Sequence, residues 1–538
     1  MRIDPMLKIP ELNLGFRDAE NYKRKENREL FNKIFIRTES LEKLLDPNIF
    51  FLIGEKGTGK TAYGVYLSNN EYREHSGSIR YISQTEYQKF LTLKKEKHLQ
   101  FSDYTSIWKV ILSLLLSQQI KEHQEDFDYF EKFLKFKALQ SAIDEFYHRA
   151  FSPEIIYAIN FVEDSKKAAE LISHFAIADA HLGIESKKEI AFSEQKFQMN
   201  LMYIQKKFDE ALLSLKLKKK NYILFIDGVD VRPSSIPYDE YIECIKGLAN
   251  AVWSINNDLL SSMRGRGKMR VILLLRPDIF NTLGLQNQNN KLRDNAEILD
   301  WRTPYRDYRT SNLFELADNL LRFQQKETLD LGEAWDYYFP YNAENVRTMQ
   351  LKNTAFIDFL RFSLYRPRDT NTILKILQDH FVRKGKDPIS VFSRDDFFDN
   401  HVRREISNYF VGEIKDQMSF YYSAKDFEIF LKFFSFLKGS SDFDYDQYLI
   451  TYNNFIRFLG ENHFDVPQFC ITPEIFLQFL YDLNIICYFD RSLDDEKFIR
   501  WCFMERSYAN ISPKVETHKY YRIHQGMRKA FNLGKLLR

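Results

Sequence analysis

The chain has 538 residues, of which 44% are apolar and 16% aromatic, with 19 glycines and 14 prolines. This composition excludes a disordered or collagen-like chain and favours helix-rich packing around aromatic side chains, and the length predicts about two to four domains. The 77 Lys and Arg nearly balance the 75 Asp and Glu, leaving a formal charge of +2. Any surface for a polyanionic partner must therefore be local.

The four cysteines are dispersed without C-x-x-C spacing, which predicts buried thiols in a reducing compartment. The longest apolar stretches fall short of the about 20 residues that a bilayer-spanning helix needs. We therefore expect a cytoplasmic protein without a membrane partner.

The first half of the chain alternates strand and helix patterns. Residues 1–47 are charged and helix-like, and an apolar strand (NIFFLIG), a glycine-rich turn and a helix (TAYGVYLSNN) follow. A second strand-like run begins near Ser78, and residues 103–218 have the apolar spacing of a helical insertion. Strand patterns return at 221–228, 269–277 and 296–301, with a helix over 238–256. Such continuous apolar strands are typical of a parallel sheet covered on both faces, so we predict a doubly wound, mainly parallel α/β core over 48–305.

The second half is mainly helical over 306–439 and mixed over 440–538. Near the end, a capped helix (EIFLQFLYDL), a strand-like IICYF, a polar turn and a strand-like FIRWCFM follow one another. This order predicts a winged-helix-like domain over 440–538.

One motif carries most of the chemistry. Residues 54–61, GEKGTGKT, match G-x-x-x-x-G-K-[ST] between a predicted strand and a predicted helix. Glycines allow the loop to direct backbone N–H groups at phosphate oxygens, a lysine reaches the β and γ phosphates, and a Thr hydroxyl binds Mg²⁺. The motif therefore predicts a P-loop NTPase fold that binds ATP and Mg²⁺ through Gly54, Gly57, Thr58, Gly59, Lys60, Thr61 and Ala62. No N-K-x-D motif that would recognise guanine stands out, so ATP is the expected nucleotide.

Two carboxylates follow the strand at 223–226. Asp227 is the expected second ligand of Mg²⁺, together with Thr61, because such a site needs an acid at the end of a second buried strand. Asp230 is a candidate for orienting the attacking water; alternatively, it satisfies its own backbone in a turn.

The loop GEKGTGKT, the strand FIDGVD and the strand VILLLRPD together resemble the STAND and KAP-type ATPases of the AAA+ lineage. In those families an acid often follows the second motif, whereas Val231 stands there in this chain. The departure leaves the catalytic base open and permits slow turnover.

The resemblance implies roles for four arginines. Arg276, after the strand at 269–275, would read the γ-phosphate, and Arg293 would enter the site of a neighbouring subunit in a homo-oligomer. Arg366 and Arg368 lie where a lid, here the region 306–439, carries a second phosphate-sensing arginine. For each the plain alternative is a solvated or packing charge.

The last 28 residues concentrate positive charge. They contain Lys514, Lys519, Arg522, Arg528, Lys529, Lys535 and Arg538 against one acid, Glu516, with Tyr520, Tyr521 and Phe531 interleaved. This pattern, with a weaker basic loop at 264–268, suits double-stranded DNA as a partner, and the alternative is a basic face that is only solvated. A winged helix also serves as a protein-docking module, so an effector protein is the alternative.

Together these features predict an ATP-hydrolysing molecular switch. The resemblance implies a bacterial defence role, such as antiviral defence, or a regulatory one. The alternatives are a nucleotide-gated scaffold that scarcely hydrolyses ATP and a DNA-processing helper ATPase.

Overall fold

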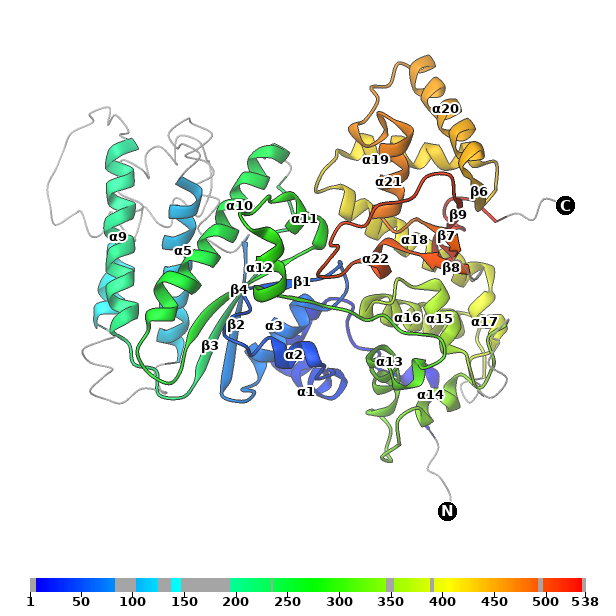
Figure 1. Cartoon of the computed structure of the whole chain (residues 1–538). Helices are drawn as coiled ribbons and strands as arrows, with labels where there is room; N and C mark the ends of the chain where they lie inside the picture. Colours follow the sequence, from blue (N-terminus) through cyan, green and yellow to red (C-terminus); the bar gives the residue numbers. More distant parts are fainter. Residues whose placement is uncertain are drawn as a thin grey trace, which may run out of the picture.

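The computed structural model describes residues 6–82, 103–123, 137–146, 194–233, 236–344, 353–387, 391–491 and 497–534. A sheet with its helices forms one half of the molecule, and the helical region with the C-terminal elements forms the other (Figure 1). The P-loop sequence lies on the first half and faces the second.

The first half is built on a five-stranded, all-parallel sheet in the order β2-β3-β4-β1-β5. The strands are β1 (Phe51–Ile53), β2 (His75–Tyr81), β3 (Asn221–Asp227), β4 (Met269–Leu275) and β5 (Ala296–Ile298). Because β4 lies between β1 and β3, its carboxyl end is next to the ends that carry the P-loop and Asp227. The predicted parallel α/β core is thus confirmed, although β2 begins three residues before Ser78.

Both faces of the sheet are covered, as the continuous apolar strands predicted. Alternate strand residues enter two separate cores: Leu224 and Ile226 join one, and Ile223 and Phe225 the other. The first face is covered by α5 (Asp103–Glu122), α9 (Glu194–Ser214) and α10 (Tyr238–Ser254), so the described parts of the predicted insertion are helical. The second is covered by α1 (Lys25–Ile34), α2 (Glu39–Lys43) and α3 (Lys60–Asn69), while α11 (Pro277–Thr282) and α12 (Gln288–Asn295) connect β4 to β5.

The region 306–439 is helical, as predicted. Its helices are α13 (Asn312–Arg322), α14 (Glu333–Tyr338), α15 (Phe356–Phe362), α16 (Pro367–Arg383), α17 (Arg394–Phe398), α18 (Asn400–Met418) and α19 (Ala424–Phe433). The N-terminal segment runs along it: Asn371 and Gln378 of α16 donate hydrogen bonds to the carbonyls of Leu14 and Leu12. This segment then reaches the core, where Asn69 of α3 donates to the carbonyl of Tyr22.

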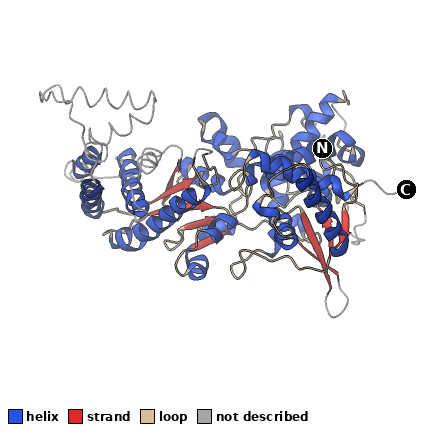
Figure 2. Cartoon of the chain, turned by 90° about the horizontal axis from the view of Figure 1, so that it is seen from above, coloured by secondary structure: helices blue, strands red, loops and turns tan. Residues whose placement is uncertain are grey.

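The C-terminal part combines α20 (Tyr445–Glu461), α21 (Pro473–Asp482) and α22 (Cys502–Glu505) with an antiparallel sheet of order β6-β9-β7-β8. Its strands are β6 (Asp442–Asp444), β7 (Ile486–Arg491), β8 (Lys497–Arg500) and β9 (Tyr520–Ile523), separate from the parallel sheet (Figure 2). The predicted hairpin is β7 with β8, but β8 ends at Arg500 and CFME is helical. Sequence reasoning also missed β9, which pairs between β6 and β7.

The four cysteines are buried free thiols, as predicted. Within the described ranges, no helix is long and apolar enough to cross a membrane.

Candidate functional site

The P-loop bends between β1 and α3 as the sequence pattern requires. Gly57 and Gly59 have φ values of 89° and 96°, a left-handed region that side chains with a Cβ rarely adopt. Thr58 Oγ1 closes the turn on the carbonyl of Glu55 at 2.8 Å. The loop therefore wraps around the N-terminal end of α3, which carries a positive potential suited to anions.

Lys60 lies buried at the centre of this loop. Its Nζ donates to the carbonyls of Gly54 at 2.8 Å and Glu55 at 3.1 Å. Burial lowers the pKa of the Lys60 ammonium to about 8, although Asp230 and Asp227 oppose the shift. A phosphate oxygen is the kind of anionic partner that would stabilise this charge.

Thr61, in the first turn of α3, and Asp227, at the end of β3, are hydrogen-bonded, and the sequence predicted that they share a cation. Thr61 Oγ1 donates to Asp227 Oδ2 at 2.6 Å, and the backbone N–H of Gly228 donates to Asp227 Oδ1 at 2.7 Å. Burial raises the pKa of Asp227, with the Thr61 bond acting in the opposite direction. One hydroxyl and one carboxylate beside a phosphate-binding loop are hard oxygen ligands that fit Mg²⁺.

Asp230 and Val231 follow β3 and line a cavity over the P-loop. Both line it together with Lys60 and Asp227, while Val231 itself is 72% exposed. Because Asp227 is committed to Thr61, Asp230 is the carboxylate of this pair that is available to a water molecule. The hydrophobic Val231 supplies no such group.

Arg276 is placed at the end of β4, between the P-loop and Asp227, but its guanidinium is already paired. It donates to Asp278 Oδ1 at 3.0 Å and Oδ2 at 2.6 Å, and only 2% of it is exposed. Burial favours the neutral form of Arg276, but the Asp278 charge outweighs it and raises the pKa. The alternative of a solvent-facing arginine is therefore wrong.

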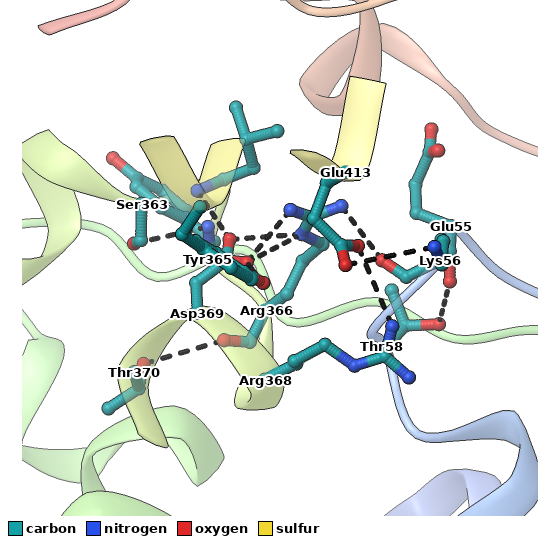
Figure 3. Close-up of polar contacts among 12 residues, drawn as sticks. Glu55, Lys56, Thr58, Ser363, Tyr365, Arg366, Arg368, Asp369, Thr370 and Glu413 are labelled. Carbon is teal, nitrogen blue, oxygen red and sulfur yellow. Dashed lines mark hydrogen bonds and ion pairs between the residues drawn. The ribbon is translucent and has the colours of Figure 1, made fainter. Parts of the chain in front are cut away.

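The two arginines before and within α16 face the P-loop in different ways (Figure 3). Arg366 grips Asp369 through Nε and Nη2, and its Nη1 donates to the carbonyl of Lys56 at 2.8 Å. Arg368 instead packs on Gly57, where an added Cβ would come within 3.1 Å of the Arg368 Cβ, and it lines the pocket. Arg366 thus holds the loop backbone, and Arg368 is the arginine placed to meet a ligand.

Further contacts on the loop were not predicted. Lys56 forms ion pairs with Asp416 at 2.6 Å and Glu413 at 3.7 Å on α18, and Glu55 pairs with Arg506 beyond α22. Trp301 Nε1 donates to the Thr58 carbonyl at 2.9 Å. These partners lie hundreds of residues from the loop in sequence, so no local pattern marks them.

A cavity of about 570 Å³ opens over the loop. Besides the P-loop and the carboxylates, it is lined by the N-terminal segment and the helical region, including Phe16, Asp18, Ile36, Leu316, Leu320 and Asn371. The P-loop side is therefore polar and carries charges of both signs, and the other side is largely apolar. Sequence reasoning missed the N-terminal segment because it carries no motif.

The remaining candidates lie elsewhere. Arg293 is an exposed residue of α12, so the segment expected to be a loop is helical, and it does not line the cavity. At the C-terminus Tyr521 and Phe531 are buried, so two of the three interleaved aromatics cannot stack on bases. Lys519 pairs with Asp490 and Arg522 with Asp442, while Lys535 and Arg538 lie outside the described residues.

The chain matches no protein-family model, and the search of curated proteins gives no significant match. The case for function therefore depends on this site.

Proposed function

We propose that the protein binds and hydrolyses ATP with Mg²⁺ at this site and uses the nucleotide state as a molecular switch. The observation that carries the proposal is the juxtaposition of a P-loop with Thr61 and Asp227 at the carboxyl ends of two parallel strands, β1 and β3, that flank β4. The cavity of about 570 Å³ is large enough for a nucleotide-sized ligand.

The residues divide the chemistry between them. Lys60 and the loop N–H groups hold the phosphates, and Thr61 and Asp227 would hold Mg²⁺, which would supply positive charge to the phosphate oxygens. Asp230 orients a water whose oxygen bonds to the γ-phosphorus as the bond to the bridging oxygen breaks, and it accepts the water proton. The apolar side of the cavity, with Phe16, Leu316 and Leu320, receives the base.

The switch acts through the second half of the molecule. Arg368 and the Lys56–Asp416 pair connect the loop to α16 and α18, so a change in phosphate number alters the contacts between the two halves. An arginine pair of this kind suits a STAND or AAA+-type ATPase, the class that the motifs resemble.

The test is ATP binding by calorimetry and phosphate release by the full chain over a range of protein concentrations, with Lys25→Ala on α1 as an exposed-lysine control. We expect Lys60→Ala to abolish both, and Lys25→Ala to leave both unchanged. An assembling ATPase shows turnover that rises with concentration and falls in Arg293→Ala. Tight binding without turnover would contradict hydrolysis and favour the nucleotide-gated scaffold.

The partner of the C-terminal domain is tested in the same assay with and without duplex DNA. α21, the last helix before the β7–β8 hairpin, contains no Lys or Arg and exposes Ile475, with Ile471 exposed just before it. This observation favours an effector protein over DNA as the partner. Stimulation of turnover by DNA would reverse that preference.

A further inference from the structure

A second cavity, of about 760 Å³, lies between α18 and the end of the described chain and shares no lining residue with the cavity over the P-loop. Three segments far apart in sequence enclose it: α18, the stretch from α19 through η8 (Phe434–Leu437) to Gly439, and residues 529–534. The proposed ATPase does not use it. We call it the C-terminal pocket.

The charge around the C-terminal pocket is one-sided. Each of the three segments contributes one cation, Arg404, Lys438 and Lys529, and none of the described residues that line the pocket is Asp or Glu. Lys529 donates to a neutral partner, Asn400 Oδ1, at 3.1 Å. By contrast, the cations of β9 and its approach, Lys519 and Arg522, are neutralised by Asp490 and Asp442.

A further cation, Arg403 of α18, lies close to Lys529. Burial lowers the pKa of Lys529, and the charges of Arg403 and Arg404 lower it further. Burial also lowers the pKa of Arg403, whose Nε is buried without a hydrogen-bond partner. Lys529 is thus repelled by the two arginines of α18, and an anion placed between these cations would relieve that repulsion.

The pocket also has an apolar wall. Phe434 and Phe531 stack with ring centroids 3.7 Å apart, and Val411, Leu431 and Leu533 complete the lining. Asn408 and Asn532 add amide groups able to donate or accept. A hollow with a cationic rim, amides and an apolar wall suits an organic molecule that carries phosphate, and its volume is typical of small-molecule sites.

We propose that the C-terminal pocket binds a phosphorylated small molecule, with its phosphate groups at Arg404, Lys438 and Lys529. A compact ligand is favoured over a nucleic acid because the cations surround a hollow and the neighbouring Tyr521 and Phe531 are buried. The ligand would join α18, η8 and the C-terminal stretch, so its binding would stabilise the contact between these elements.

The test is calorimetric titration of the full chain with inorganic pyrophosphate, a probe of the phosphate subsite. The pocket variant is Arg404→Gln/Lys438→Gln/Lys529→Gln, and the matched control is Lys25→Gln/Lys425→Gln/Arg457→Gln, whose three cations are exposed outside the pocket. Lys60→Ala and Thr61→Ala separate binding at the P-loop from binding here. Circular dichroism checks that each variant is folded.

We expect the affinity for pyrophosphate at the C-terminal pocket to fall about tenfold or more in the pocket variant. The matched control and both P-loop variants should retain that site. If the pocket variant binds as the wild type does, or if pyrophosphate binding disappears entirely in the P-loop variants, the inference is wrong. Binding of a duplex DNA that depends on the same three cations, without competition by pyrophosphate, would also overturn it in favour of a nucleic-acid surface.

Discussion

Hydrogen bonds within the protein already position the single side chains to which we assign phosphate and Mg²⁺ binding. Thr61 and Asp227 are held 2.6 Å apart, and the carbonyls of Gly54 and Glu55 fix Lys60 in the loop. Little side-chain order would therefore have to be acquired on binding, which favours affinity. Burial lowers the pKa of Lys60 and raises the pKa of Asp227. We therefore expect ATP binding to depend on pH.

ATP affinity should fall as the pH rises above about 8, where Lys60 loses its proton. Burial lowers the pKa of Lys60 to about 8, so the group is charged below that value and neutral above it. Because phosphate favours the charged form, the dissociation constant should be flat in acid and rise by up to about tenfold per pH unit in alkali. Calorimetry between about pH 6.5 and 9.5 measures this. Lys60→Arg, which stays charged, should remove the slope, and a flat wild-type profile would contradict the prediction.

Asp230→Asn should slow hydrolysis while leaving ATP binding intact. Asp227 accepts the hydrogen bond of Thr61, so of the two carboxylates that follow β3 we expect Asp230 to accept the proton from water. Loss of a general base reduces kcat by about 10²–10⁴-fold, which steady-state phosphate release measures. Asp239→Asn, at an exposed position in the first turn of α10, is the control. Unchanged kcat in Asp230→Asn would assign the water to another group.

The residues that sequence alone predicted share one property. The P-loop, Thr61 and Asp227 lie in short patterns whose strand, turn and helix dictate their positions, so spacing was sufficient. The partners Trp301, Arg506 and Phe16 reach the site only through the packing of distant segments. A single sequence without covarying positions contains no signal for such contacts.

At the scale of elements, the start of α16 shows how two neighbouring arginines acquire different tasks. Both were eligible as phosphate sensors in the sequence, because a Pro-led helix start positions either one. In the structure Asp369, on the first turn of α16, accepts hydrogen bonds from Nε and Nη2 of Arg366, and Tyr409 of α18 donates to the same carboxylate at 2.8 Å. Arg366 is therefore a positioning residue for the loop, whereas Arg368 lines the cavity.

Arg366→Ala should destabilise the fold, and Arg368→Ala should weaken nucleotide binding instead. Removing Arg366 leaves the fully buried Asp369 without its counter-charge, a loss of about 3–5 kcal/mol in the free energy of unfolding. Arg368 pairs with Glu413 at 3.5 Å while partly exposed, so its removal should cost at most about 1 kcal/mol. Urea unfolding measures the first effect and ATP calorimetry the second. Equal stability of the two variants would contradict this division of roles.

At the scale of the whole molecule, the two halves are joined at a second place besides the P-loop. Phe420, in the connection between α18 and α19, is fully buried in the core that covers the first face of the sheet. Its carbonyl accepts a bond from Arg232 Nε at 2.7 Å, and its ring lies 5.4 Å from the Arg276 guanidinium. The next residue, Tyr421, donates to Asp278 Oδ2 at 2.7 Å. Arg276, directly after β4, and its partner Asp278 are therefore in contact with the second half of the molecule.

Phe420→Ala should destabilise the contact between the α18–α19 connection and the start of α11. The lost ring leaves a cavity among Tyr238, Tyr241 and Arg276, and such a truncation costs about 3–5 kcal/mol. We expect faster amide hydrogen exchange both in the α18–α19 connection and at the start of α11, because the Arg276–Asp278 pair loses its cover. The control is Phe436→Ala, a half-buried ring that packs on Phe455 and Phe458 within the C-terminal part, and it should leave α11 unchanged. If exchange at α11 stays at the wild-type rate in Phe420→Ala, then Phe420 does not couple the second half of the molecule to the Arg276–Asp278 pair.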